Sequence, residues 1–175
     1  GLTVKEGATT DKVLLAYNNG TDSLLSDEQA RKAFRYQIDA AGIASAQPDA
    51  AGALGGPISP LEPGYEDSTG LYPHDENQAG QMFSYFGAQY LTTVNLVVPE
   101  EYRSLAETIK QQIERQPRPT VNLEVLSDED YAKRIKDGKW ELTVMSMDGT
   151  DDAGIFADPD SMFHYDHTEA QQAYA

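Results

Sequence analysis

One stretch of this 175-residue chain alternates short β-compatible runs with amphipathic helical runs, and this alternation limits the folds that are open to the chain. The strand-like runs lie at 91–98, 120–126 and 139–147, and the helical runs between them lie at about 102–116 and 128–137. Strands that are joined by helices pair in parallel, and their crossover connections are right-handed. The stretch therefore predicts an α/β fold with a βαβαβ core.

Capping signals mark both ends of the second helix in this array. Ser127 suits the N-cap of 128–137, because its hydroxyl can accept a hydrogen bond from a free backbone N–H of the first turn. Acidic residues in the first turn and basic residues in the last turn complement the helix dipole, and Gly138 suits the helix end. The last strand, 139–147, is apolar on both faces, which is typical of a buried parallel strand.

The first half of the chain predicts one more strand and three helices. An apolar run at 12–17 ends at a turn signal and indicates a strand. Ser26 begins a capping-box pattern before a helix at about 27–38. Shorter helices are expected at 40–46, behind an aspartate cap, and at about 75–87.

A long segment rich in proline and glycine separates these two parts of the chain. It covers 47–78, and aliphatic and aromatic residues in it could hold it against a surface. A loop of this length inside a compact domain usually has a function or covers something. We expect 1–175 to form a single lobe, with 164–175 as a tail.

The charge composition excludes several classes of function. Lys and Arg number 13 and Asp and Glu number 29, which gives a formal net charge of −16. This charge argues against a nucleic-acid-binding protein and against docking on an anionic membrane. Cysteine is absent, so disulfides, thiolate metal sites and thiol nucleophiles are excluded. No apolar run approaches the length of a membrane span.

The acidic loop after the last predicted strand is the place where we expect a binding site. In open α/β sheets, ligands bind outside the carboxyl ends of the strands. The loop at 148–163 carries Asp148, Asp151, Asp152 and Asp158. A desolvated carboxylate there could form a charge-assisted hydrogen bond with an ammonium group. The alternative is a solvated acidic loop without a specific role.

Four segments of the chain stand in the order, and near the spacing, of one known family. They are DEQARKAFRYQID at 27–39, GPISP at 56–60, YAKRIKDGKWEL at 131–142 and DPDSMF at 158–163. At the first of these segments, the family shows Asp-x-x-Val-Arg-x-Ala-Leu-x-Tyr-x-Ile-Asp. At the third segment, it shows Tyr-x-x-Arg-Leu-x-x-Gly-x-Tyr-Asp-Leu. The chain thus resembles the second lobe of extracytoplasmic solute-binding proteins of peptide-type ABC transporters, the oligopeptide/dipeptide/nickel class.

The resemblance implies a fold and a role in transport. The fold would be a periplasmic-binding-protein type II lobe, a mixed sheet with a βαβαβ core flanked by helices. The function would be the capture of peptides or similar small solutes for import, with no enzymatic activity and no cofactor. The implied partners are the ligand, the first lobe of the same longer chain and the ABC permease subunits. The implied parent is an extracytoplasmic bacterial lipoprotein, in the periplasm or on the outer face of the cell membrane, attached by an N-terminal lipid anchor.

The resemblance also suggests which residues contact the ligand. The family has Gly-Trp at the end of the last strand, with the Trp lining the cleft, where this chain has Ser146-Met147. In oligopeptide binders, an Asp shortly after that Trp holds the α-ammonium group of the peptide, and several Asp residues here compete for that role. Asn18 follows the first strand, near the point where the family's lobes hinge. The predicted ligand-binding set is Asn18, Met147, Asp148, Asp151, Asp152, Phe156 and Asp158.

Two other classes of function remain open from the residues alone. One is an acidic extracellular interaction module, in which Asp148, Asp151 and Asp152 would bind calcium, although the EF-hand spacing is absent. The other is a hydrolase with a pair of catalytic carboxylates. His164 and His167 could also bind a metal ion, but without a helical context an exposed tail is the simpler interpretation.

Overall fold

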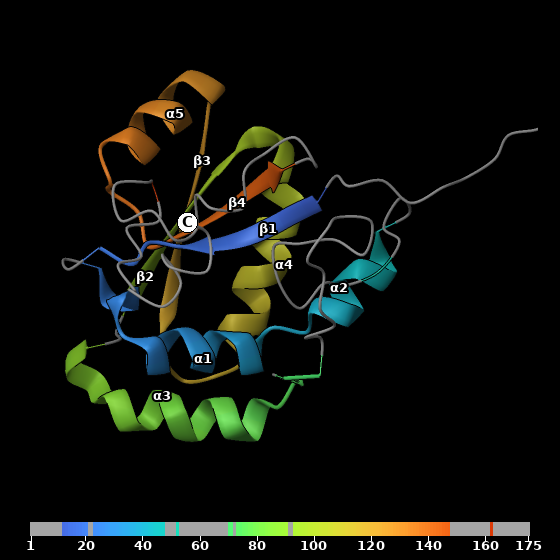
Figure 1. Cartoon of the computed structure of the whole chain (residues 1–175), viewed down its shortest axis with the longest axis vertical. Coiled ribbons are helices and arrows are strands. Elements are labelled where there is room, and N and C mark those ends of the chain that lie inside the picture. Colours follow the sequence, from blue (N-terminus) through green and yellow to red (C-terminus); the bar gives the residue numbers. More distant parts are fainter. Residues whose placement is uncertain are drawn as a thin grey trace, which may run out of the picture.

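The strands form one four-stranded sheet in the computed structural model (Figure 1), which describes residues 12–20, 23–47, 52, 70–71, 73–90, 93–147 and 162. The order across the sheet is β1-β4-β2-β3. The strands are β1 (Lys12–Tyr17), β2 (Thr93–Pro99), β3 (Thr120–Leu126) and β4 (Leu142–Met147).

The three later strands run parallel and the first strand runs against them. β2 pairs in parallel with both β3 and β4. β1 pairs antiparallel with β4, so that Lys12 lies opposite Met147 and Tyr17 lies opposite Leu142. The mixed sheet with a parallel βαβαβ core is therefore confirmed. As a result, the carboxyl ends of β2, β3 and β4 lie at the same edge of the sheet as the amino end of β1.

Helices lie on both faces of the sheet. Figure 1 shows α1 and α3 side by side on one side of the sheet and α5 on the other. The helical segments are η1 (Leu24–Ser26), α1 (Glu28–Gln37), α2 (Ala40–Ala46), α3 (Glu76–Tyr90), η2 (Glu100–Tyr102), α4 (Arg103–Ile113) and α5 (Asp128–Lys136).

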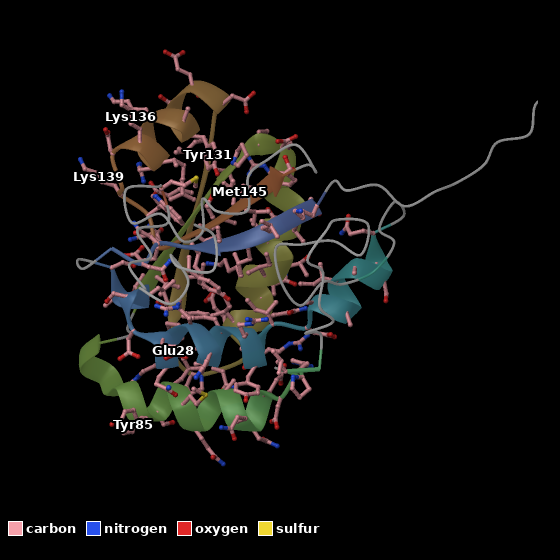
Figure 2. All side chains as sticks on the ribbon, viewed as in Figure 1. Glu28, Tyr85, Tyr131, Lys136, Lys139 and Met145 are labelled. Atoms are coloured by element: carbon pink, nitrogen blue, oxygen red, sulfur yellow. The ribbon has the colours of Figure 1, made fainter. Side chains whose placement is uncertain are left out.

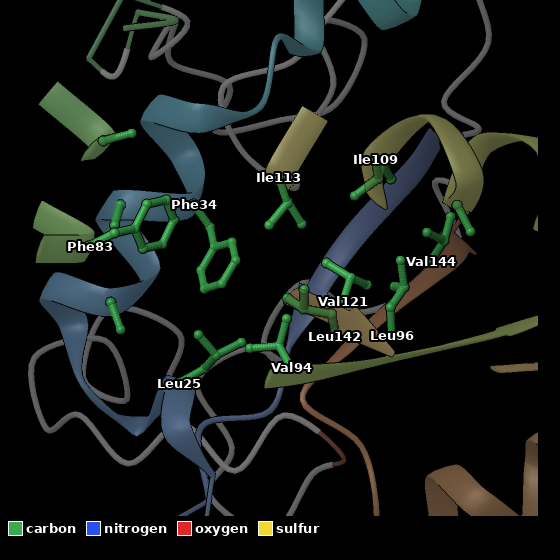
Figure 3. Packing of buried hydrophobic residues seen from close by; sticks show 14 of the residues in the cluster. Leu25, Phe34, Phe83, Val94, Leu96, Ile109, Ile113, Val121, Leu142 and Val144 are labelled. Carbon is green, nitrogen blue, oxygen red and sulfur yellow. The ribbon is translucent and has the colours of Figure 1, made fainter. Parts of the chain in front are cut away.

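The larger hydrophobic core lies between the sheet and α1, α3 and α4 (Figure 3). Leu96 of β2 and Leu142 of β4 pack there together with Ile109 of α4. The rings of Phe34 and Phe83, from α1 and α3, meet edge to face with centroids 5.1 Å apart. Burial of such apolar side chains supplies the main driving force for this layer.

A smaller core lies on the opposite face of the sheet. Ala16, Val97 and Trp140 form its buried centre. Half-buried side chains surround it: Leu126, Tyr131, Ile135, Met145 and Met162. Because successive side chains of a strand point to opposite faces, Val97 belongs to this core while its neighbours Leu96 and Val98 belong to the larger one.

Glutamines that are buried or half-buried connect α1, α3 and the end of α4. The fully buried Gln37 donates to the backbone oxygen of Gln112 at 2.6 Å and accepts from Gln116 at 2.8 Å. Gln116 also donates to the backbone oxygen of Glu76, the first residue of α3, at 2.7 Å. These bonds satisfy the amide groups within an otherwise apolar layer.

The predicted N-cap of the first helix is wrong by one residue. Asp27, and not Ser26, caps α1, and its carboxylate accepts the backbone N–H of Gln29 at 2.8 Å. The reason is a preceding 3-10 turn, η1, which includes Ser26 and buries Leu25. The predicted caps Asp39, Ser127 and Gly138 are confirmed.

Several predicted boundaries also differ from the structure. The strand expected to end at 98 includes Pro99 as its last residue, and the helix expected to reach 116 ends at Ile113. β4 begins at Leu142 and not at 139, because the preceding residues form a separate connection after α5. The proline- and glycine-rich segment at 47–78 lies largely outside the described residues, and its last three residues belong to α3.

The C-terminal residue of β1 makes the stability of the fold sensitive to alkaline pH. Tyr17 packs against the larger core, and burial raises its pKa from 10.0 to about 12, although Arg35 and Arg31 partly oppose this shift. A raised pKa favours the neutral phenol in the folded state. The stabilisation is therefore complete below pH 10 and is lost as the pH rises towards 12.

We expect the free energy of unfolding to fall by roughly 2 kcal/mol more between pH 9 and pH 12 in the natural sequence than in Tyr17→Phe. Urea denaturation at each pH measures this difference. Tyr85→Phe, at a position that is 85% exposed, is the matched control and should follow the natural sequence. If the free energy of unfolding changes with pH in the same way in the natural sequence and in Tyr17→Phe, the pH dependence does not come from Tyr17.

Candidate functional site

The carboxyl edge of the parallel strands is the candidate ligand-binding edge. Pro99, Leu126 and Met147 end the three parallel strands there, and Lys12 begins β1 beside them. Ligands of open α/β sheets bind at such an edge. The structure places the main chain of Met147 at this edge, as the sequence analysis expects.

Most of the predicted ligand-binding residues lie outside the described residues. These are Asp148, Asp151, Asp152, Phe156 and Asp158. Of Met147 the structure describes the backbone. Their contacts with a ligand stay predictions. The described chain shows that β4 ends at the carboxyl edge, directly before the acidic loop in the sequence, and that Met162 lies against the smaller core.

Asn18 lies at the opposite edge of the sheet from Met147. Its backbone N–H donates to the backbone oxygen of Glu141 at 2.9 Å, directly before β4 begins. Met147 is at the other end of the six-residue β4. At about 3.3 Å per residue, the two positions, six residues apart along the strand direction, are separated by about 20 Å. The strands therefore do not bring Asn18 together with the end of β4.

The side chain of Asn18 fastens β1 to the connection between α5 and β4. Its amide nitrogen donates to the backbone oxygens of Trp140 at 2.9 Å and Gly138 at 3.2 Å. Its amide oxygen accepts the backbone N–H of Gly20 at 3.0 Å. Asn18 is 5% exposed, and in this conformation both of its amide hydrogens are used within the chain. Contact of Asn18 with a ligand stays a prediction.

Helix α5 is attached to the sheet by two polar contacts. Arg134 makes two hydrogen bonds to the carboxylate of Glu124 on β3. The hydroxyl of Tyr131 lies 2.7 Å from the hydroxyl of Thr143, a buried residue of β4. Burial raises the pKa of Tyr131, and its hydrogen bond with Thr143 partly opposes this shift. Figure 2 labels Tyr131 and Met145 on this side of the sheet.

Trp140 is buried, but its indole nitrogen has no hydrogen-bond partner among the described residues. The side chain is 3% exposed. Buried donors in native proteins are nearly always paired, because an unpaired donor loses its bonds to water without compensation. The sequence gives no signal for this orphan donor.

Metal binding has no support in the described part of the chain. No group of three or more His, Asp and Glu side chains comes together there. The calcium hypothesis concerns Asp148, Asp151 and Asp152, and the second metal hypothesis concerns His164 and His167. All five lie outside the described residues. Within the described residues, no helix combines the length and the apolar character that a membrane span requires.

The sequence does not match a protein-family model or a curated protein. Solved structures, in contrast, share its fold. One is the oligopeptide-binding protein AppA from Bacillus subtilis, in complex with a nonapeptide, with a TM-score of 0.74 and 16% identity. The match covers 95% of this chain and 38% of that chain.

Two further structures show the same relationship. The murein tripeptide binding protein MppA from Escherichia coli matches with a TM-score of 0.79 and 13% identity, over 94% of this chain and 35% of that chain. AgaA from A. tumefaciens R10, in complex with agropinic acid, matches with a TM-score of 0.76 and 18% identity. This match covers 94% of this chain and 36% of that chain. The comparisons confirm the expected periplasmic-binding-protein fold, and this chain spans little more than a third of the length of these proteins.

We expect Asn18→Ala to lower the free energy of unfolding by about 1–3 kcal/mol, because the backbone oxygens of Trp140 and Gly138 lose their donor. Chemical denaturation measures the loss. Asn122→Ala is the matched control, since Asn122 is exposed and bonds through its side chain to Asn95. Equal effects of the two substitutions would show that Asn18 does not fasten the connection.

Proposed function

We propose that this chain is one lobe of a solute-binding protein of a peptide-type ABC transporter, and that the whole protein captures peptides or similar small solutes for import. One observation carries the proposal. Nearly the entire chain, 94–95%, shares the fold of a part, 35–38%, of proteins described as binding a nonapeptide, a murein tripeptide and agropinic acid. The four sequence segments that resemble the peptide-type family support the same assignment.

The ligand would lie at the carboxyl edge of β2, β3 and β4, facing the other lobe of the longer protein. Asp148, Asp151, Asp152 and Asp158 supply the candidate carboxylates for a peptide ammonium group. Closure of two lobes removes water, and a charge-assisted hydrogen bond is strong where water is excluded. Met147 and Phe156 supply apolar surface beside these carboxylates.

The proposal includes a location and partners for the longer protein. It would act outside the cytoplasm, held by an N-terminal lipid anchor, and would deliver its ligand to the permease subunits. Hinge closure would present the loaded form to the permease. Binding and release need neither catalysis nor a cofactor, so the proposal assigns no enzymatic activity.

A panel of short peptides tests this function on the longer protein by thermal shift. A ligand at 100 times its dissociation constant stabilises the folded state by about 2.7 kcal/mol, so a binding peptide should raise the melting temperature clearly. Asp148, Asp151, Asp152 and Asp158 are each replaced by Asn in turn. The replacement of the Asp that contacts the peptide ammonium group should abolish the shift in melting temperature. Peptides with an acetylated amino end are the matched control and should bind at least ten-fold more weakly.

The isolated chain of 175 residues should bind the same peptides at least 100-fold more weakly, because it contributes one side of the cleft. Tight binding by the isolated chain, or equal binding of acetylated and free peptides, would contradict the proposal. Stabilisation by calcium that a chelator reverses, without any peptide effect, would instead favour the interaction module.

A further inference from the structure

The turn that follows β1 contains two neighbouring residues that can react with each other. Asn19 is the single Asn of the sequence that is followed by Gly. Asn side chains are among the thermolabile groups of proteins. The reaction requires the backbone nitrogen of the next residue to reach the side-chain amide, and glycine, which has no side chain, permits this close approach. Asn19 and Gly20 are both half-buried, so water reaches the turn.

Hydrogen bonds hold both reacting groups of this turn in the folded chain. The backbone N–H of Gly20 donates to the amide oxygen of Asn18 at 3.0 Å. The backbone oxygen of Gly20 accepts the N–H of Ser23 at 2.8 Å. The side-chain nitrogen of Asn19 donates to the backbone oxygen of Tyr17 at 3.1 Å. The nitrogen that would attack and the nitrogen that would leave are therefore both bonded to other groups.

Two bonds to the connection between α5 and β4 fix the orientation of Asn18. Its amide nitrogen donates to the backbone oxygens of Gly138 and Trp140, and its amide oxygen is thereby turned towards Gly20. The backbone N–H of Gly20 must lose its proton before the nitrogen attacks, and a hydrogen bond to the neutral N–H disfavours this loss. Asn18 therefore slows the reaction for as long as the connection is intact.

We propose that Asn19 is a site of spontaneous deamidation and that Asn18 holds its rate down in the folded chain. The backbone nitrogen of Gly20 loses its proton and bonds to Cγ of Asn19, the Cγ–Nδ2 bond breaks, and Nδ2 leaves as ammonia with that proton. The product is a succinimide ring. One water molecule then opens the ring at either carbonyl carbon, which leaves aspartate or isoaspartate at position 19. No oxidant or reductant takes part, and the reaction depends on this turn and not on the proposed function.

Mass spectrometry with peptide mapping measures the reaction in this chain. Deamidation replaces an amide by a carboxylate and changes the mass, whereas isomerisation at Asp137-Gly138 would leave the mass unchanged. We expect the mass change to map to Asn19 and to grow faster in urea, where the chain is unfolded, than in the folded chain. Asn19→Gln should remove it under both conditions. Equal rates in urea and in the folded chain, or a mass change that maps to another Asn, would overturn the proposal.

Two variants separate the role of Asn18 from a general loss of stability. Asn18→Ala removes the acceptor of the Gly20 N–H and should raise the deamidation rate of the folded chain about five-fold, the effect of one hydrogen bond. Gln37→Ala is the matched control, because it also removes buried hydrogen bonds, and these join Gln37 to Gln112 and Gln116 and not to the turn. It should leave the rate unchanged. No acceleration by Asn18→Ala, or equal acceleration by both variants, would overturn the proposal.

The modified turn should stabilise the end of β1 less than the natural turn does. A carboxylate at position 19 has no hydrogen to donate to the backbone oxygen of Tyr17. Asn19→Asp, which mimics one product, should raise the unfolding equilibrium constant about five-fold, the effect of one lost hydrogen bond. Asn77→Asp is the matched control, since it adds the same charge at an exposed position in the first turn of α3, where negative charge is favourable. Equal effects of the two substitutions on the unfolding equilibrium would refute this part of the proposal.

Discussion

The pairing of β2 with a parallel strand on each side is the constraint on which the rest of the structure depends. β2 lies between β4 and β3, and its last four residues are buried. The chain reaches β3 through α4 and then returns across β2 to β4 through α5. Two crossovers of one hand that run in opposite directions must lie on opposite faces. This explains why Ile109 of α4 belongs to one core and Tyr131 of α5 to the other.

The same pairing gives the two edges of the sheet different roles. The amino edge is closed by internal bonds: Asn18 holds the connection after α5, and Glu141 accepts the backbone N–H of Asn95 at 2.9 Å. At the carboxyl edge, in contrast, β4 ends at Met147, and the acidic loop follows directly in the sequence. Asn18 and Glu141 at the amino edge already bond to other parts of the chain and stabilise the fold. The proposed ligand contacts therefore lie at the carboxyl edge.

Signals that are local in sequence predicted most of the fold. Ser127 and Gly138 bound α5 because capping depends on residues next to the helix end. The sequence analysis erred where a neighbouring turn competed, as at Ser26, whose place in η1 moved the cap to Asp27.

The sequence predicted less of the candidate site than of the fold. The position of Asn18 depends on the antiparallel pairing of β1 with β4, which joins residues far apart in the chain. The Asn-Asn-Gly turn signal could have indicated its role, since Asn side chains often bond to nearby backbone in turns. The unpaired donor of Trp140 has no sequence signal, because it depends on which acceptors the described fold places around this buried side chain.

The central claim is that ligand binds at the carboxyl edge of the parallel strands. Amide hydrogen exchange of the longer protein, with and without a saturating peptide, tests it most directly. The account predicts new protection at the ends of the strands, around Glu100, Ser127 and Met147, and unchanged exchange around Asn18 and Thr93. Protection centred on Asn18 and Thr93, with none near Met147, would contradict it.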